Sequence, residues 1–277
     1  MKLKPFKYTI HGYGATLDVS KTASPDTTTT EYAEEQTRAN TEKVHSYLIP
    51  LIKKLKVSSI LDVGCGLGTM VQALFEQQYE AYGVDLPALG KYWREQSLSK
   101  EHFFVVGPSP MKLPFYDNSL DFVYSFGVAE HVGTSDGHAT RRPDYHNIRR
   151  EWLREIYRVV RPGGYLLIGG PNRNFPIDVA HGLDADAGSI EKYLSRMLHA
   201  SIHRVWRPYF LWGYRDIKQY LFGLPYFIRG LSVHDLLAHG RVPEMLQPLT
   251  CAYTRYLPKK LLATGFNPWM MALIRKQ

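Results

Sequence analysis

A regular alternation of short β-rich runs with helix-like segments constrains this chain more than any other feature of its sequence. The runs fall at residues 58–63, 81–86, 102–106, 120–126 and 164–169. Each interval is long enough for a crossover, and parallel strands need crossovers of a dozen or more residues. The alternation therefore predicts an α/β fold, with a doubly wound, mostly parallel sheet and helices on both faces.

The segments outside this alternation predict the remaining parts. Polar residues interrupted by proline at 20–30 indicate a loop or flexible arm, and an amphipathic helix is expected from about Glu31 to Lys56, kinked or divided at Pro50. We predict four parts: an arm and helix, an α/β core, a helical, aromatic-rich cap, and a C-terminal helix (about 257–264) and strand (269–274) that complete the core. Their bounds are 1–56, 57–171, 172–250 and 251–277.

Composition limits the environment but not the partner. The 277 residues contain no apolar run near the roughly 18 residues that span a bilayer, and the N-terminus lacks the apolar stretch of a signal peptide. We expect a cytoplasmic protein whose two cysteines, Cys65 and Cys251, stay reduced. The net charge of +8 suits nucleic acid, an anionic membrane or a phosphorylated substrate. Its basic residues are scattered pairs, so charge alone does not choose among them.

Residues 60–70 read as a strand, a glycine-rich turn and the start of a helix. Gly64, Gly66 and Gly68 allow positive φ and close backbone approach, and a helix start offers unpaired N–H groups. A nucleotide-like ligand over this turn is one interpretation, and a tight turn without a ligand is the other.

Asp85 favours the first interpretation because it ends the next β-rich run, about 20 residues further on. A carboxylate at that place accepts hydrogen bonds from ribose hydroxyls in doubly wound nucleotide sites. After Gly64 and Gly66, the dinucleotide fingerprint would have its third glycine at position 69, which is Thr69 in this chain. The spacing therefore disfavours NAD and FAD.

Four blocks together resemble a known family, and the resemblance covers roughly residues 40–172. They are Leu61-Asp62-Val63-Gly64-Cys65-Gly66-Leu67-Gly68; Gly83-Val84-Asp85; Leu113-Pro114-Phe115 with Asp121-Phe122-Val123-Tyr124-Ser125 and Glu130-His131-Val132; and residues 155–164, Glu155-Ile156-Tyr157-Arg158-Val159-Val160-Arg161-Pro162-Gly163-Gly164. This set is similar to the class I S-adenosylmethionine methyltransferases with a Rossmann-like fold, particularly the small-molecule group that includes ubiquinone-type and sterol-type enzymes.

The resemblance implies S-adenosyl-L-methionine as the cofactor. Asp62 and the glycine turn (Gly64, Cys65, Gly66, Gly68) would hold its methionine end, Asp85 its ribose and Leu86 one face of adenine. The backbone of Ser125, Phe126 and Gly127 would line its sulfonium side. Relatives usually place an acid after the third strand to contact adenine. Here Ser109, or the backbone of the turn that ends at Met111, is expected to substitute.

Glu130 and His131 follow the fourth run, at the rim where an acceptor would meet the methyl group. Histidine, with an ordinary pKa of about 6.5, suits proton removal from a hydroxyl or ammonium. The alternative is that His131 has a structural hydrogen bond and that alignment supplies the acceleration.

Residues 206–227 contain nine aromatic residues with basic residues interleaved. One interpretation is a cap that recognises a partly apolar, anionic small molecule, or that contacts a membrane peripherally. The other is that large rings build the small core of the cap. The arm at 20–30 and the helix after it are expected to close over the cofactor as a lid.

Other functions and sites stay open. A nucleic-acid (RNA) methyltransferase is disfavoured, because Ser125-Phe126-Gly127-Val128 replaces the Asn/Asp-Pro-Pro-aromatic pattern typical of base methylation. A catalytically inactive cofactor-binding module remains an alternative. His199 and His203 have a zinc-like spacing without an evident third ligand, so we predict no metal.

Overall fold

The computed structural model describes residues 40–86, 93, 100–107, 110–134, 141–178, 187–198, 201–206, 210–236 and 244–277. The helical elements are η1 (Val44–Leu48), α3 (Ile49–Leu55), α4 (Thr69–Glu76), η3 (Lys100–His102), η4 (Ala129–His131), α6 (Tyr145–Val159), α7 (Ser189–Leu198), α8 (Tyr214–Tyr220), η6 (Glu244–Leu246), α9 (Gln247–Tyr256) and η7 (Lys259–Leu261). The strands are β1 (Ser59–Val63), β2 (Glu80–Asp85), β3 (Phe103–Val105), β4 (Leu120–Phe126), β5 (Val160–Pro171), β6 (Ile177–Asp178), β7 (Ser201–Ile202), β8 (Tyr226–Gly230) and β9 (Trp269–Lys276).

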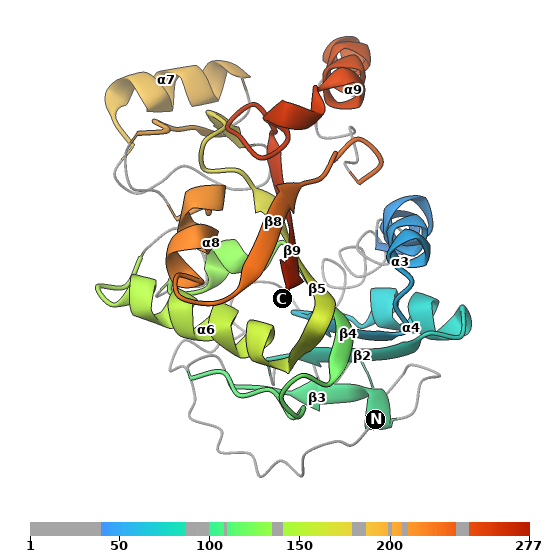
Figure 1. Cartoon of the computed structure of the whole chain (residues 1–277). Coiled ribbons are helices and arrows are strands. Elements are labelled where there is room, and N and C mark those ends of the chain that lie inside the picture. Colours follow the sequence, from blue (N-terminus) through green and yellow to red (C-terminus); the bar gives the residue numbers. More distant parts are fainter. Residues whose placement is uncertain are drawn as a thin grey trace, which may run out of the picture. The chain divides into compact units, whose positions relative to one another are not determined.

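Seven strands form one sheet in the order β3-β2-β1-β4-β5-β9-β8, and β6 and β7 form a separate antiparallel pair (Figure 1). Strand β1 pairs in parallel with β2 and β4, and β2 pairs in parallel with β3, whereas β8 and β9 are antiparallel. Every residue of β1 is buried, as expected for a central parallel strand covered on both faces. The predicted doubly wound, mostly parallel α/β sheet is confirmed.

The chain forms two compact units. Residues 1–125 with 155–165 make the first, and residues 126–154 with 166–277 make the second. These bounds differ from the predicted division at residues 171 and 250, because β5 begins in one unit and ends in the other. Residues 1–39, which include the predicted arm and the start of the lid helix, lie outside the described residues.

The first helix is predicted to kink or divide at Pro50, and the structure shows a change of hydrogen-bond pattern there within a continuous helical backbone. A π-helical stretch, η1, runs into α3, which has Pro50 at its start and is followed by Lys56 in the left-handed conformation. Proline lacks the N–H that continues a regular helical ladder, so the hydrogen-bond pattern changes around it.

Two predicted elements are wrong. Part of the cap range is a strand, since Tyr226–Gly230 alternates half-buried and exposed residues and pairs with β9 as β8 of the main sheet. The predicted helix at 257–264 is replaced by α9, which ends at Tyr256, and the short turn η7. Leu257 precedes Pro258 and takes an extended ψ of 120°, because the proline ring disfavours helical geometry in the residue before it.

The aromatic residues at 206–227 divide into two groups. Phe210, Trp212, Tyr214 and Tyr220 are buried. The ring of Trp212 packs edge to face with those of Tyr220 and Trp152, at centroid separations of 5.1 and 5.8 Å. The core-packing interpretation therefore holds for these four. Trp206, Phe222 and Phe227 are exposed. The other two fall in neither group, because Tyr226 is half-buried and Tyr209 lies outside the described residues.

Candidate functional site

The glycine turn lies at the carboxyl end of β1, where β2 also ends. The parallel register pairs Val63 with Val84, and the N–H groups of Gly64 and Cys65 both donate to the Val84 carbonyl, at 2.8 and 3.1 Å. The N–H of Gly66 then donates to Oδ2 of Asp85 at 2.6 Å. Parallel pairing thus joins the glycine turn to the acid predicted to bind ribose.

The turn needs glycine for two different reasons. Gly66 and Gly68 have φ values of +56° and +81°, in the left-handed region that favours glycine. A Cβ on Gly68 would also lie 2.7 Å from the Phe103 ring, whereas a Cβ on Gly66 would meet no atom within 4 Å. Open space therefore lies over Gly66, just before α4 begins at Thr69.

Within the part of the chain that the structure describes, Asp85 accepts hydrogen bonds from two backbone N–H groups. Its Oδ1 accepts the N–H of Leu86 at 2.7 Å, in addition to the Gly66 contact on Oδ2. Each carboxylate oxygen can accept a second hydrogen bond, so both remain able to bind hydroxyl groups. Burial raises the pKa of Asp85, although the two N–H donors oppose it. The side chain of Leu86 is exposed beside the acid.

Asp62 is buried on β1 next to β4. The register places it opposite Tyr124, whose hydroxyl donates to Asp62 Oδ2 at 3.0 Å. Burial raises the pKa of Asp62 to about 8, against the effect of the Tyr124 hydrogen bond, and the charge of Asp85 adds to the rise. Among the described residues, no cation donates a hydrogen bond to this carboxyl group, which suits a site that receives a cation.

Two residues of this region escaped the sequence analysis. Tyr124 lies inside one of the recognised blocks, and the alignment of β1 with β4 is the signal that could have identified it. The indole of Trp93 donates to the Gly66 carbonyl at 2.9 Å and stacks on Phe103. No local pattern marks Trp93, because its role depends on contacts 10 and 27 residues away.

The remaining predicted cofactor residues of the first unit are buried or undescribed. The Ser125 hydroxyl donates to the Val63 carbonyl at 2.7 Å, so its side chain fixes β4 against β1. Met111 is buried. Cys65 is a buried free thiol, and Cys251 is a partly exposed free thiol. The two cysteines are therefore unpaired, as predicted. Ser109 lies outside the described residues.

The second unit holds the other predicted residues around two glycines of β5. The Gly127 N–H donates to the Gly169 carbonyl at 2.9 Å. A Cβ on Gly169 would lie 2.6 Å from the Phe126 ring, and a Cβ on Gly170 would lie 3.0 Å from Oε2 of Glu130. The paired glycines thus leave room for the ring and for the buried carboxyl group of Glu130.

Arg149, on α6, fixes the turn that carries His131. Its guanidinium is buried and donates to the carbonyls on either side of His131, those of Glu130 at 3.3 Å and Val132 at 2.8 Å, and also to that of Phe210 at 2.5 Å. Arg149 belongs to one of the scattered basic pairs of the sequence, Arg149-Arg150, for which a solvated surface is the default prediction. That prediction is wrong for Arg149. Its burial follows from tertiary contacts with residues 17 to 61 positions away.

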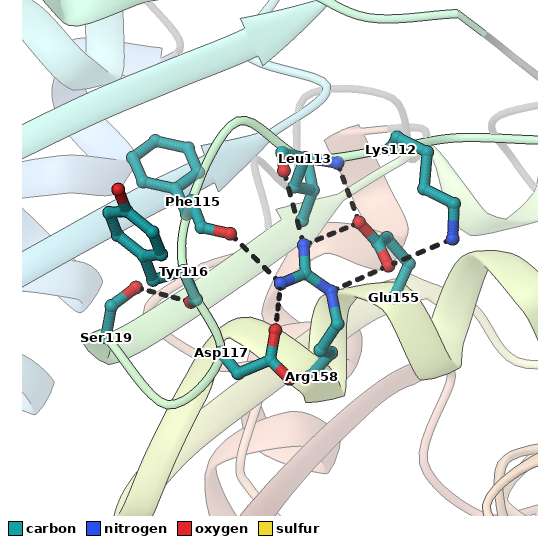
Figure 2. Close-up of polar contacts among 8 residues, drawn as sticks. All are labelled: Lys112, Leu113, Phe115, Tyr116, Asp117, Ser119, Glu155 and Arg158. Atoms are coloured by element: carbon teal, nitrogen blue, oxygen red, sulfur yellow. Dashed lines mark hydrogen bonds and ion pairs between the residues drawn. The ribbon is translucent and has the colours of Figure 1, made fainter. Parts of the chain in front are cut away.

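Two further blocks of the resemblance meet in a polar cluster of the first unit, shown in Figure 2. The Arg158 guanidinium donates to both Glu155 oxygens at 2.7 and 2.9 Å, to Asp117 at 2.6 Å, and to the carbonyls of Leu113 and Phe115. The Leu113 N–H completes the cluster with a 2.8 Å bond to Glu155. These residues tie the chain before β4 to α6, so their role is structural.

The histidine pair does not form a described metal site. His203 is buried, and its Nε2 lies 3.0 Å from the Arg173 carbonyl, while His199 lies outside the described residues. Within the described part of the chain, no cluster of three potential metal ligands occurs. The same part of the chain contains no helix both long and apolar enough to cross a membrane.

Comparisons with known proteins agree with this geometry. Residues 61–168 match the family described as a methyltransferase domain. The chain is 28% identical over 144 residues to a probable chloroplastic tocopherol O-methyltransferase of Oryza sativa subsp. japonica, covering 50% of this chain and 36% of that protein. It is 30% identical over 117 residues to sterol 24-C-methyltransferase of Schizosaccharomyces pombe, covering 39% and 26%. It is 32% identical over 116 residues to demethylmenaquinone methyltransferase of Anoxybacillus flavithermus, covering 39% and 43%.

The chain thus spans less than half the length of each of these relatives. The matched residues coincide with the sheet from β1 to β5 and include the glycine turn, Asp85 and the turn with Glu130 and His131. Residues 61–168 of the chain are therefore similar to a methyltransferase domain.

Proposed function

We propose that this protein binds S-adenosyl-L-methionine and transfers its methyl group to a small-molecule acceptor. The observation that carries the proposal is the bond from the Gly66 N–H to Asp85, beside open space at the start of α4. A backbone turn with positive φ, a helix start and an adjacent acid are the features that a nucleoside with a charged tail requires.

The residues present fit the cofactor by their chemistry. Asp85 keeps acceptor capacity on both oxygens for the ribose hydroxyls, and the exposed Leu86 offers an apolar surface for adenine. Asp62 is a buried carboxyl group without a cationic hydrogen-bond partner, so an ammonium group nearby would stabilise its ionised form. The adenine contact by Ser109 and Met111 stays a prediction, as does closure of the segment before residue 40.

When bound, the cofactor supplies a methyl group on a positively charged sulfur, which an acceptor lone pair displaces in line. The chain's contribution is to align the partners, exclude water and accept a proton where the acceptor carries one. We assign proton removal to His131, with Glu130 beside it in η4. Arg149 supports this assignment because it fixes the two peptide groups that flank His131.

The acceptor is proposed to be a small, partly apolar molecule with an anionic group, covered by residues 172–250. The three relatives described above are named for tocopherol, a sterol and demethylmenaquinone, all of them small molecules. The exposed side chains of Trp206 and Phe222 are available for contact with an acceptor, whereas the four buried aromatic side chains of this region are not. We further propose a cytoplasmic enzyme of biosynthesis, with peripheral membrane contact.

The test is incubation of the full chain with methyl-labelled S-adenosyl-L-methionine and a cell extract, followed by mass spectrometry. We expect one class of small molecule to gain the label. Labelled RNA would instead support the nucleic-acid alternative, and cofactor binding by calorimetry without any labelled product would support the inactive module.

His131→Asn tests the proposed base once an acceptor is identified. We expect kcat to fall about 100-fold, within the range of general-base effects, with cofactor affinity unchanged and the dependence of kcat on pH flattened. A variant that keeps the wild-type pH profile would show that His131 is not the base and that alignment of the reactants supplies the rate acceleration.

A further inference from the structure

Helix α7 presents its apolar face to solvent. Ile190, Tyr193 and Met197 are 68%, 64% and 59% exposed, and their spacing of three and four places them on one side of the helix. A helix that packs on a globular core normally shows the opposite arrangement, with its apolar stripe buried.

The buried side of α7 is polar and satisfied within the second unit. Glu191 forms an ion pair with Arg204, and the Ser195 hydroxyl accepts the Ile202 N–H at 2.9 Å. Both side chains are buried. The helix is thus held by polar contacts, and its outward apolar side chains are not needed for that attachment.

Helix α9 and the turn η6 before it repeat this arrangement. Met245, Leu249 and Tyr256 are between 67% and 85% exposed and follow one face, whereas Thr254 is buried. The Thr254 hydroxyl lies 3.1 Å from His234 Nδ1 and 3.0 Å from the Thr250 carbonyl. Figure 1 shows α7 and α9 at the same end of the second unit.

The charges beside the two apolar faces favour one occupant. Exposed cations lie in α7, in α9 and in the turn η7 that follows α9, whereas Glu244 is the one exposed acid in residues 189–197 and 244–261. The cations are Lys192, Arg196, Arg255, Lys259 and Lys260. A second copy of the chain, related by a twofold axis, would bring like charges together. Anionic lipid headgroups complement the cations, and acyl chains accept the apolar side chains.

We propose that α7 and α9 form a docking surface for an anionic lipid bilayer, with their apolar faces entering the interface and their lysines and arginines contacting the headgroups. The exposed Trp206 follows Arg204, the ion-pair partner of α7, and indole rings favour the boundary between water and lipid. This proposal rests on the proposed function in one respect, because it names the surface through which the peripheral membrane contact is made. Its binding to lipid requires neither cofactor nor acceptor, so either proposal can fail without the other.

The experiment is sedimentation of the full chain with vesicles of phosphatidylcholine alone or mixed with phosphatidylglycerol. We expect binding that rises with the phosphatidylglycerol fraction and falls with salt. The double variant Ile190→Glu, Met197→Glu should lower the partition coefficient at least tenfold, as should Leu249→Glu. Lys192→Gln should lower it about fivefold, the value of one cation near an anionic surface.

Tyr116→Glu is the matched control, since Tyr116 is an exposed aromatic residue of the first unit. It should leave vesicle binding unchanged, and circular dichroism should show that all variants remain folded. Failure of the wild-type chain to bind anionic vesicles would overturn the proposal. So would equal loss of binding in Tyr116→Glu, or light scattering that shows a dimer dissociated by the α7 variant, because a second copy would then be the occupant.

Discussion

Buried carboxylates of the first unit occur in two surroundings, which differ in the groups that donate hydrogen bonds to them. At the glycine turn, Asp62 and Asp85 accept hydrogen bonds from a tyrosine hydroxyl and from backbone N–H groups. In the polar cluster of Figure 2, Glu155 accepts two hydrogen bonds from Arg158 and lies 3.8 Å from Lys112. Both groups belong to blocks of the same resemblance, yet among the described residues only the second group contains its own cations.

The pKa directions follow from this difference. Burial raises the pKa of Asp62 to about 8 and also raises that of Asp85. Burial acts on Glu155 in the same direction, but Arg158, the Leu113 N–H and Lys112 outweigh it and hold its pKa below the ordinary value. Buried acids without a cation suit a site that receives a charged ligand, whereas a neutralised acid suits a structural role.

Arg158→Met should have the largest effect on this comparison. It would leave the buried Glu155 carboxylate with only the exposed Lys112, at 3.8 Å, as a cation, and we expect the free energy of unfolding to fall by about 3 kcal/mol. Urea unfolding at pH 7 measures the change. Arg161→Ala is the control, because Arg161 pairs with Asp121 near the surface and should cost only about 0.5 kcal/mol. Equal losses in the two variants would contradict a structural role specific to the cluster.

Asp85→Asn should act on the cofactor rather than on folding. It removes the charged acceptor that we propose for the two ribose hydroxyls, so we expect affinity for S-adenosylhomocysteine to fall about 10-fold to 100-fold. Calorimetry measures the affinity. Asp117→Asn removes the same charge from the Arg158 cluster and should leave that affinity unchanged. An unaltered affinity in Asp85→Asn would remove Asp85 from the site.

A third effect concerns the pH dependence of stability, which should have opposite signs for Asp62 and Glu155. Between about pH 4 and 8, folded Asp62 holds a proton that the unfolded chain has lost, so its contribution to stability falls as pH rises, by at most about 1.4 kcal/mol per pH unit. Asp62→Asn should therefore gain stability over the wild type from pH 5 to pH 8, in urea unfolding without cofactor.

Glu155 has a lowered pKa, so its contribution is present above its ordinary value of 4.5 and is lost as pH falls through the folded value. The stability deficit of Glu155→Gln should accordingly shrink in acid. Parallel pH profiles for the two variants would show that the two carboxylates do not differ in the way the structure indicates.

Local patterns predicted the sheet well. The β-rich runs at 58–63, 81–86 and 120–126 correspond to β1, β2 and β4 within one residue at each end. The glycine turn and Asp85 were also found, because strand, turn and acid follow each other within about 25 residues. The prediction from local patterns failed at β8. The many aromatic residues there were interpreted as part of a helical cap, but pairing with β9 makes this segment a strand of the main sheet.

The sequence by itself determined the alternation of strands and helices, the conformation of the glycine turn and the family, since each depends on neighbouring residues or fixed spacing. Only the tertiary structure decided which charges are neutralised and which faces are exposed. The buried guanidinium of Arg149 donates hydrogen bonds to three carbonyls that are distant in the sequence. Asp62 accepts a hydrogen bond from Tyr124, 62 residues away. Helix α7 turns its polar side inward because Arg204 and Ile202 supply partners there. Such outcomes depend on contacts between residues far apart in the chain, which a local pattern does not record.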